Sequence, residues 1–343
     1  MDIIQTGSVP LSIQKHLGSP DPRVTGWFLL KSPIPLIVIF IFYMGIVFFG
    51  PRFMKNRKPF NIKHILLIYN FSQIMLSFYI FKEFLVTSYM SGYSWTCQPV
   101  DYSMAPLALR MASACWWFYF SKVLDLLDTV FFVLRKKLSQ LTFLHLYHHS
   151  TMIFNWYLGT LYLPGGQAFF SGLVNSLVHV IMYTYYLLAA IGPHMQKYLW
   201  WKRYLTQLQL VQFVAVIIHL IVGLWNKCEA PAWLTIWTIG YVSSLVMLFL
   251  NFYIKAYHAR GASALEKKKM EEKSVEQINK STHASNGFIR QGKVSLKRVE
   301  RAKQMHSRGQ GEGNSDKSIV KYSNGYISGA KSNYGTNNGK KIH

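Results

Sequence analysis

Residues 34–49 read "IPLIVIFIFYMGIVFF", an unbroken apolar run without a charged side chain. At about 1.5 Å of rise per residue, a helix built on this run can cross the hydrocarbon core of a bilayer. No basic segment leads into the run and no cleavage pattern follows it, so we predict a retained membrane helix and not a signal peptide. The chain has 343 residues and is 51% hydrophobic, which favours an integral membrane protein.

Apolar stretches of about 20 residues recur after this first one. They predict an all-α integral membrane protein with seven transmembrane helices, near residues 34–50, 64–86, 111–134, 141–163, 167–190, 205–225 and 233–256. We therefore divide the chain into an N-terminal arm (1–33), a membrane domain (34–257) and a tail (258–343). The tail is rich in Lys, Ser, Gly and Asn, a composition that predicts a basic, largely disordered segment.

Basic loops alternate with loops that carry almost no Lys or Arg. The segments after the first, third, fifth and seventh predicted helices are basic, whereas 88–109 contains neither residue and 226–232 contains only Lys227. Because positive loops stay in the cytosol, the N-terminal arm is expected on the lumenal side and the tail in the cytosol. The formal charge of +23 then follows from topology, and no nucleic-acid partner is expected.

The cysteines fit this orientation. Cys97 and Cys228 fall in two predicted lumenal loops, where an oxidising compartment would allow a disulfide between them. Two free thiols are the alternative. Cys115 lies within a predicted helix and is expected to pack as a small apolar side chain.

Polar side chains occur in four of the predicted helices at about the same depth. His145, His148 and His149 have the spacing i, i+3, i+4, which places them on one helical face. The whole set comprises Lys122, Asp125, Asp128, His145, His148, His149, Asn175, His179, Gln209 and Gln212. Since such groups usually face the interior of a helix bundle, we predict a polar chamber open to the cytosol, with an apolar slot beneath it. Interhelical hydrogen bonds and a structural Lys122–Asp125 ion pair are the alternatives.

Clustered histidines raise the question of a metal. A non-haem iron desaturase or hydroxylase is the alternative function, but its di-iron centre needs more histidines than this domain offers, and HxxHH occurs once. Without a metal, neutral imidazoles can act as nucleophile and general base. The two Asp residues would orient them, and Lys122, Asn175 and the Gln side chains would stabilise an oxyanion. We therefore predict no metal and no bound cofactor.

A second set of residues is expected to contact the substrate. Lys136, Lys137, Lys202, Arg203 and Arg260 form a basic rim at the cytosolic mouth, which suits a polyanion such as the phosphates of coenzyme A. Topology alone would also place these charges there. Tyr183 and Tyr186, on the helix of His179, are assigned to the same binding role.

Four segments together resemble a known family. They are "KVLDLLDT" (122–129), "HLYHH" (145–149), "NSLVHVIMYTYY" (175–186) and "TQLQLVQF" (206–213). In order and spacing they are similar to the signature boxes of the ELO family of fatty acid elongases. The resemblance implies that 34–257 is a seven-span ELO catalytic domain of the endoplasmic reticulum membrane. It also implies condensation of a long-chain acyl-CoA with malonyl-CoA, giving 3-oxoacyl-CoA, CO2 and free CoA.

The resemblance assigns roles to the histidines. It implies an acyl-imidazole on His148, with His179 assisting at the thioester, and an alkyl chain that extends into the slot as an acyl tunnel. The family usually has Glu where this chain has Asp125, so the carboxylate here is one methylene shorter. Gln140 and the segments "GGQAFF" and "QKYLWWKRYLTQLQLVQF" are similar to members acting on polyunsaturated and very long chains.

Other expectations concern partners and location. The C-terminal "KKIH", with Lys340 and Lys341, resembles a retrieval signal for the endoplasmic reticulum. The family implies contacts with the other enzymes of the elongation cycle, which are ketoacyl-CoA reductase, dehydratase and enoyl reductase. A homo-oligomer is a further expectation from the family.

Overall fold

The computed structural model describes residues 19–230, 232–258, 266, 269–277, 294–302 and 304. The chain divides into two compact units, residues 1–265 and 266–343. In the second unit, residues 269–277 and 294–302 are helical. The predicted rim residue Arg260 and the predicted retrieval residues Lys340 and Lys341 lie outside the described residues.

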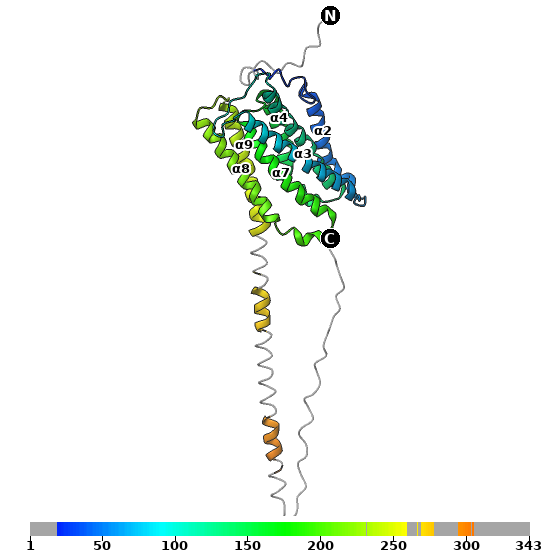
Figure 1. Ribbon diagram of the computed structural model, residues 1–343. Helices are drawn as coiled ribbons and strands as arrows, with labels where there is room; N and C mark the ends of the chain where they lie inside the picture. The colour runs from blue at the N-terminus through cyan, green and yellow to red at the C-terminus, as the bar shows by residue number, and fades with distance from the viewer. Residues whose placement is uncertain are drawn as a thin grey trace, which may run out of the picture. The chain divides into compact units, whose positions relative to one another are not determined.

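Regular structure in the described residues of the first unit is entirely helical (Figure 1). The long helices are α2 (Ile34–Met54), α3 (Lys63–Met90), α4 (Pro106–Asp125), α5 (Leu127–Leu134), α6 (Phe143–Tyr162), α7 (Ala168–Ile191), α8 (Lys202–Trp225) and α9 (Ala232–Tyr253). Shorter turns are the 3₁₀ segments η1 (Leu138–Gln140) and η2 (Pro193–Tyr198) and the π-helical η3 (Ile254–His258). The prediction of an all-helical membrane protein is confirmed.

Five of these helices are long and apolar enough to cross a membrane. They are α2, α3, α7, α8 and the segment Ala232–Tyr257 formed by α9 and the turn after it. The α4 and α6 helices are not among them. The former carries Arg110, Lys122 and Asp125 and the latter carries three histidines, so their polar residues lower the mean hydropathy of each.

The predicted helix 111–134 is not continuous. The structure divides it at Leu126, whose backbone N–H bonds to the carbonyl of Val123 in a tighter turn than that of an α-helix. Neither Pro nor Gly occurs at this position, so the local sequence does not predict that the helix is interrupted here. It coincides with the two carboxylates, Asp125 and Asp128, that share a tertiary partner on α7. A second difference is that α2 continues through Pro51 to Met54.

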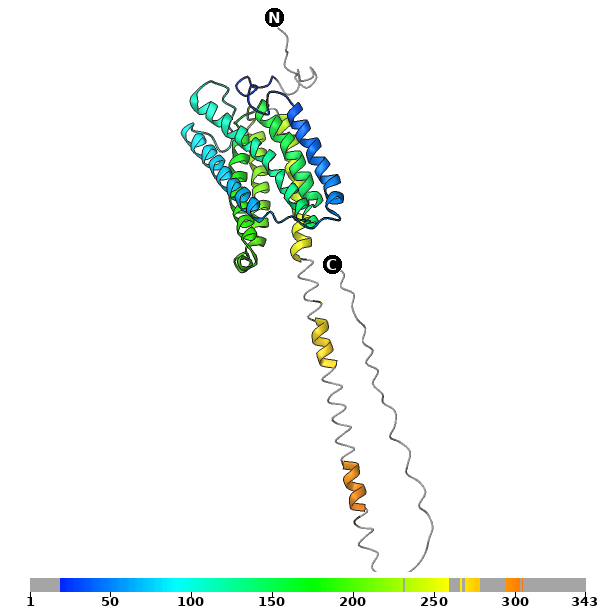
Figure 2. The same cartoon turned by 90° about the vertical axis from the view of Figure 1, so that its right-hand side faces the viewer.

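The helices lie side by side with loops gathered at two ends (Figures 1 and 2). Neighbouring pairs include α3 with α7, α3 with α4, α4 with α6, α2 with α5, α7 with α8, and α8 with α9. We call the end with loops 55–62, 135–142 and 192–201 the basic end. The opposite end, with 19–33, 91–105, 163–167 and 226–230, contains the disulfide and is called the disulfide end.

Covalent and ionic contacts tie the segments of the disulfide end together. Cys97 and Cys228 form the disulfide expected for them, with their Cα atoms 5.4 Å apart. The arm is tied to the same loops because Arg23 pairs with Asp21 at 2.6 Å and donates to the carbonyls of Asp101 (2.6 Å) and Ser103 (3.0 Å). The α6–α7 turn packs so tightly there that a Cβ on Gly166 would lie 2.7 Å from Val100.

Removing the disulfide is expected to lower thermal stability. The bridge closes a loop with a sequence separation of 131 residues. For a loop of this length, chain entropy alone predicts that removing the bridge lowers the free energy of unfolding by up to about 5 kcal/mol. Because either cysteine alone has no partner, C97S, C228S and the double variant should lower the melting temperature in detergent equally. Additive effects of the two single substitutions would contradict a bridge as their common cause.

Candidate active site

The ammonium group of Lys122, near the C-terminal end of α4, is the centre of a buried polar cluster. Its Nζ donates to Oδ1 of Asn175 at 2.9 Å and to Oδ2 of Asp125 at 3.3 Å. It also lies 3.4 Å from both ring nitrogens of His179. The side chains of Lys122 and Asp125 are each only 2% exposed. Two turns of α7 therefore place an amide and an imidazole around one cation.

The carboxylate of Asp125 is held from three further sides. Its Oδ1 accepts hydrogen bonds from Gln73 of α3 (3.1 Å) and from the hydroxyl of Tyr183 (2.8 Å). Its Oδ2 lies 3.8 Å from Nδ1 of His179. The Tyr183 hydroxyl is also 3.0 Å from Asp128, and its single proton can serve only one of the two carboxylates at a time. Asp125 is thus held by side chains from α3, α4 and α7, and Asp128 shares with it the hydroxyl of Tyr183.

The three histidines of α6 have different surroundings. Thr142 caps the helix by accepting from the backbone N–H of His145, and the His145 imidazole lies 2.8 Å from the hydroxyl of Thr129. Its ring is 4.2 Å from that of His149, which in turn is 5.2 Å from the ring of His148. Within the described part of the chain, the imidazoles of His148 and His149 make no hydrogen bond. The ring nitrogens of these two residues therefore have no hydrogen-bond partner among the described side chains.

The histidine face and the Lys122 cluster are neighbours. His145, on the same face of α6 as His148 and His149, bonds to Thr129, the residue that follows Asp128. One turn further along α6 from His148 is Met152, which lines a large cavity. The face of α6 that bears His148 therefore continues, one turn later, into the wall of that cavity.

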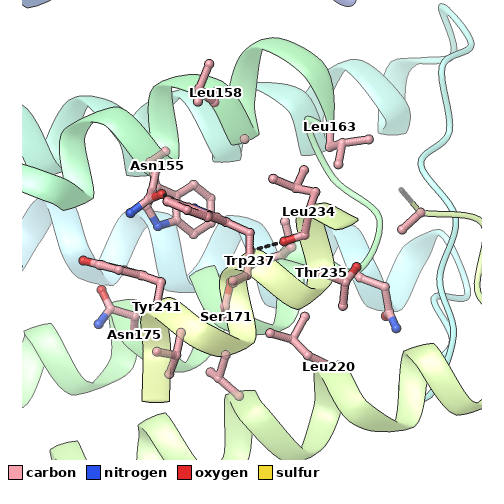
Figure 3. Close-up of a pocket in the computed structure, with 18 of the residues that line it drawn as sticks. Asn155, Leu158, Leu163, Ser171, Asn175, Leu220, Leu234, Thr235, Trp237 and Tyr241 are labelled. Atoms are coloured by element: carbon pink, nitrogen blue, oxygen red, sulfur yellow. Dashed lines mark hydrogen bonds between the residues drawn. The ribbon is translucent and has the colours of Figure 1, made fainter. Parts of the chain in front are cut away.

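The cavity has a volume of about 980 Å³ and is lined by side chains of α6, α7, α8 and α9 (Figure 3). Most of its wall is apolar or aromatic, including Leu220, Leu234 and Trp237. Asn175, which accepts from Lys122, forms the polar end at which the cavity meets the Lys122 cluster. The far wall consists of Gln98, Val100, Gly165, Gln167, Glu229 and Ala230, from loops of the disulfide end. The size is at the upper end of the usual range for small-molecule sites.

Asn175 connects the cluster to the cavity. Its carbonyl oxygen is engaged by Lys122, so the side-chain NH2 group remains as a donor at the cavity wall. Gln212 also lines this wall, is 5% exposed, and its Oε1 has no partner among the described residues. Both amide side chains thus line an otherwise largely apolar cavity.

Several predicted residues lie away from this centre. Gln209 contacts the sulfur of Met182 at 3.5 Å and is not part of the cavity wall. Tyr186 packs edge-on against Tyr183, with ring centroids 5.8 Å apart. In the predicted rim, Lys136 donates to the carbonyls of Lys55 and Arg57, both at 3.0 Å. Arg203 donates to the hydroxyl of Tyr253 at 2.8 Å. Lys137 lies in the loop 135–142, and Lys202 is the first residue of α8.

The sequence analysis did not include Gln73, which holds Asp125 from α3. A signal for it exists, because Asn70, Gln73 and Ser77 recur at helical spacing in an otherwise apolar segment, and all three are buried. Tyr43 of α2 was also missed. It accepts a hydrogen bond from Thr129 at 3.3 Å and so supports the partner of His145.

Among the residues that the structure describes, no three His, Cys, Asp or Glu side chains converge as metal ligands would. The cluster instead combines a cation, two carboxylates, an amide and an imidazole. Such a set can stabilise an oxyanion, orient an imidazole and move a proton. Beside an apolar cavity in a membrane-spanning bundle, it defines a membrane enzyme with an apolar substrate.

Comparison with known proteins identifies the family. Residues 28–265 match the sequence model of ELO, the GNS1/SUR4 family. Very long chain fatty acid elongase 4 of Homo sapiens is 50% identical over 237 residues, covering 69% of this chain and 76% of the relative. Very long chain fatty acid elongase 5 of Mus musculus is 43% identical over 256 residues, covering 75% and 85% of the two chains. Very long chain fatty acid elongase AAEL008004 of Aedes aegypti is 45% identical over 255 residues, covering 73% and 71%.

The chain therefore belongs to the ELO family. Family membership makes it an enzyme of fatty acid elongation, of the 3-oxoacyl-CoA synthase class, and a multi-pass membrane protein. The resemblance found in the four sequence boxes is confirmed.

Proposed function

We propose that this protein condenses a long or very long acyl-CoA with malonyl-CoA, giving 3-oxoacyl-CoA, CO2 and free CoA. One observation carries the proposal. The Lys122–Asp125–Asn175–His179 cluster lies at the polar end of an apolar cavity of about 980 Å³. A thioester needs both parts, because its carbonyl is polar and its alkyl chain is not.

We further propose that α4–α5 and α6 also cross the bilayer, which makes seven spans. Their polar side chains face inward, because Lys122 and Asp125 are buried and the histidines face the cluster. The basic end would then face the cytosol and the disulfide end the lumen of the endoplasmic reticulum. Lys136, Lys137, Lys202 and Arg203 would lie at the mouth through which the CoA thioesters enter.

The proposed reaction has two stages. A nitrogen of His148 attacks the thioester carbon of the acyl-CoA, the C–S bond breaks, and CoA leaves as a thiol with the proton released by the imidazole. Malonyl-CoA then loses CO2, and the electron pair of the broken C–C bond forms a new bond to the acyl carbon. The C–N bond to His148 breaks, and the departing nitrogen takes up one proton from water, which regenerates the neutral imidazole.

In this proposal the residues of the cluster bind and orient the reacting groups. The NH2 group of Asn175 faces the cavity and would donate to the developing oxyanion. Lys122 holds that amide and, with Asp125, orients His179 toward the malonyl carbonyl. No bound cofactor is required, since both carbon chains arrive as CoA thioesters.

Substrate class and assembly extend the proposal. Three relatives compared above are named very long chain fatty acid elongases, which supports a long acyl chain here. We propose a preference that includes polyunsaturated chains because Gln140 and the segments 165–170 and 196–213 are similar to family members acting on such chains. Contacts with the reductases and dehydratase of the cycle, and a homo-oligomer, are proposed from the family alone.

Filling the cavity should shorten the acyl chains that the enzyme accepts. Gly159 of α6 lines the cavity, and a Cβ added there would meet no atom within 4 Å. G159L is therefore expected to fold normally but to lower kcat/KM for the longest acyl-CoA substrates by roughly 10–200-fold, with shorter ones spared. The control is G45L, at a glycine of α2 with equally open surroundings that does not line the cavity. Equal losses at every chain length would argue against the cavity as the acyl site.

The function is tested on detergent-purified, metal-stripped protein given an acyl-CoA of 18–24 carbons and labelled malonyl-CoA. Formation of 3-oxoacyl-CoA with release of labelled CO2 is the expected result. Activity that appears only when iron, oxygen and a reductant are supplied would replace the proposal by a lipid desaturase or hydroxylase, the alternative suggested by the HxxHH pattern.

A further inference from the structure

The α6 and α9 helices meet along a seam made of polar contacts. Three hydrogen bonds cross it at successive turns, from Tyr147 to Ser244 (2.9 Å), Thr151 to Tyr241 (2.8 Å) and Trp237 to Asn155 (3.2 Å). We call these three pairs the α6–α9 ladder. In membranes, such interhelical hydrogen bonds are individually weak.

Apolar packing holds α9 to a different neighbour. The buried side chains Val242 and Leu245 of α9 pack in one cluster with Phe213, Val216 and Leu220 of α8. The α9 helix is therefore anchored mainly to α8, whereas on the α6 side one side chain, Tyr147, joins this cluster and the ladder adds its hydrogen bonds. A seam of this kind can open without disrupting a packed core.

The cavity wall along this seam includes side chains that are not buried. Leu158, Trp233 and Trp237 line the cavity and are 38%, 43% and 61% exposed. Figure 3 shows Asn155, Trp237 and Tyr241 together at the edge of the cavity. The same side chains thus separate the cavity from the surface that would face lipid.

From this arrangement we propose that the α6–α9 seam is a lateral portal, through which the hydrocarbon chain of the substrate or product passes between the cavity and the bilayer. The pair Trp237–Asn155 acts as its latch. The inference rests on the proposed function, because it assigns the cavity to an acyl chain. We assign the hydrocarbon chain to the portal because the portal opens directly into the cavity that holds this chain in the proposed function.

Physical chemistry favours a sideways route for a long chain. An alkyl chain withdrawn lengthwise through the basic end would enter water, and each exposed methylene adds an unfavourable transfer free energy. A chain that swings out through the seam passes from one apolar environment to another. The CoA head group can meanwhile remain at the basic end, so that only the helix contact has to open.

A cross-link across the seam tests the portal. The variant N155C/W237C is first loaded with a labelled acyl-CoA of 24 carbons, then bridged with a short bismaleimide, and then given malonyl-CoA. Free cysteines are otherwise limited in the described residues to Cys115, which is buried. We expect one 3-oxoacyl-CoA per bridged protein, followed by a steady-state rate at least tenfold below that of the unbridged variant. Each single-cysteine variant, treated with the same reagent, is the control.

Two results would overturn the portal. One is an unchanged steady-state rate in the bridged protein, and the other is loss of even the first product, which would mean that the bridge disturbs the site itself. Wild-type protein is assayed in parallel, and its failure to make any 3-oxoacyl-CoA would refute the proposed function instead.

A second variant tests the latch without a cross-link. W237F keeps the aromatic ring but removes the donor to Asn155, and loss of one such hydrogen bond should speed release of labelled product about threefold. W200F, at an exposed tryptophan outside the seam, should leave the release rate unchanged. Equal release rates in the two variants would show that Trp237 does not hold the portal closed.

Discussion

Alanine at position 148 should abolish the covalent acyl adduct and lower turnover at least about 1,000-fold, within the range found when a group acting directly in bond formation is removed. The reason is positional. The His148 imidazole is free of hydrogen bonds among the described residues, and it shares a face of α6 with His145, which bonds to Thr129 beside Asp128. It is also one helical turn from Met152, at the start of the cavity wall.

Intact-mass analysis after incubation with acyl-CoA alone measures the adduct, and labelled CO2 release measures turnover. H64A is the control, because His64 is exposed at the start of α3 and far from the cluster in sequence. If an adduct persists in H148A, the nucleophile would have to be reassigned to His149 or His145. Full turnover without any adduct would replace the covalent route by direct attack on a bound acyl-CoA.

The second large effect is expected at Lys122. Its side chain and that of Asp125 are each 2% exposed, so K122M leaves a buried carboxylate without its cation. Breaking such a pair from one side typically costs about 3–5 kcal/mol of folding free energy. We expect a marked fall in the thermal midpoint of the detergent-solubilised protein, together with loss of condensation activity.

A double variant separates stability from catalysis. K122M/D125N removes both charges while retaining a side-chain oxygen for the hydrogen bonds from Gln73 and Tyr183. It should recover most of the stability, since neutralising both partners avoids an unpaired buried charge, and yet remain inactive. K82M is the control. Lys82 is 50% exposed beside Glu83, and its removal should change stability by about 0–1 kcal/mol. An active double variant would remove Lys122 from the mechanism.

Much of the fold could be predicted because a bilayer restricts a chain severely. Apolar runs that long must be helices, since no water is present to satisfy the backbone. Polar residues within such runs stand out for the same reason, which is why Lys122, Asp125, Asn175 and His179 could be grouped from sequence alone. The pairing of Cys97 with Cys228 followed from the same topology.

Other features of the site depend on which faces of the helices contact one another. These contacts cannot be predicted from a single sequence. The role of Gln73, the turn at Leu126 and the shared hydroxyl of Tyr183 each require α3, α4 and α7 to be side by side. The cavity likewise requires side chains of α4, α6, α7, α8 and α9 and of loops at the disulfide end to surround one space.

The sequence by itself determined the helical class, the family, the disulfide partners and the chemical types in the cluster, because hydropathy and residue spacing are local properties. Only the tertiary structure decided that Asn175 joins the cluster to the cavity, that the His148 imidazole has no hydrogen-bond partner in the described part of the chain, and that α6 meets α9 through a polar ladder. These depend on contacts between residues far apart in the chain, whose free energies are set by packing geometry.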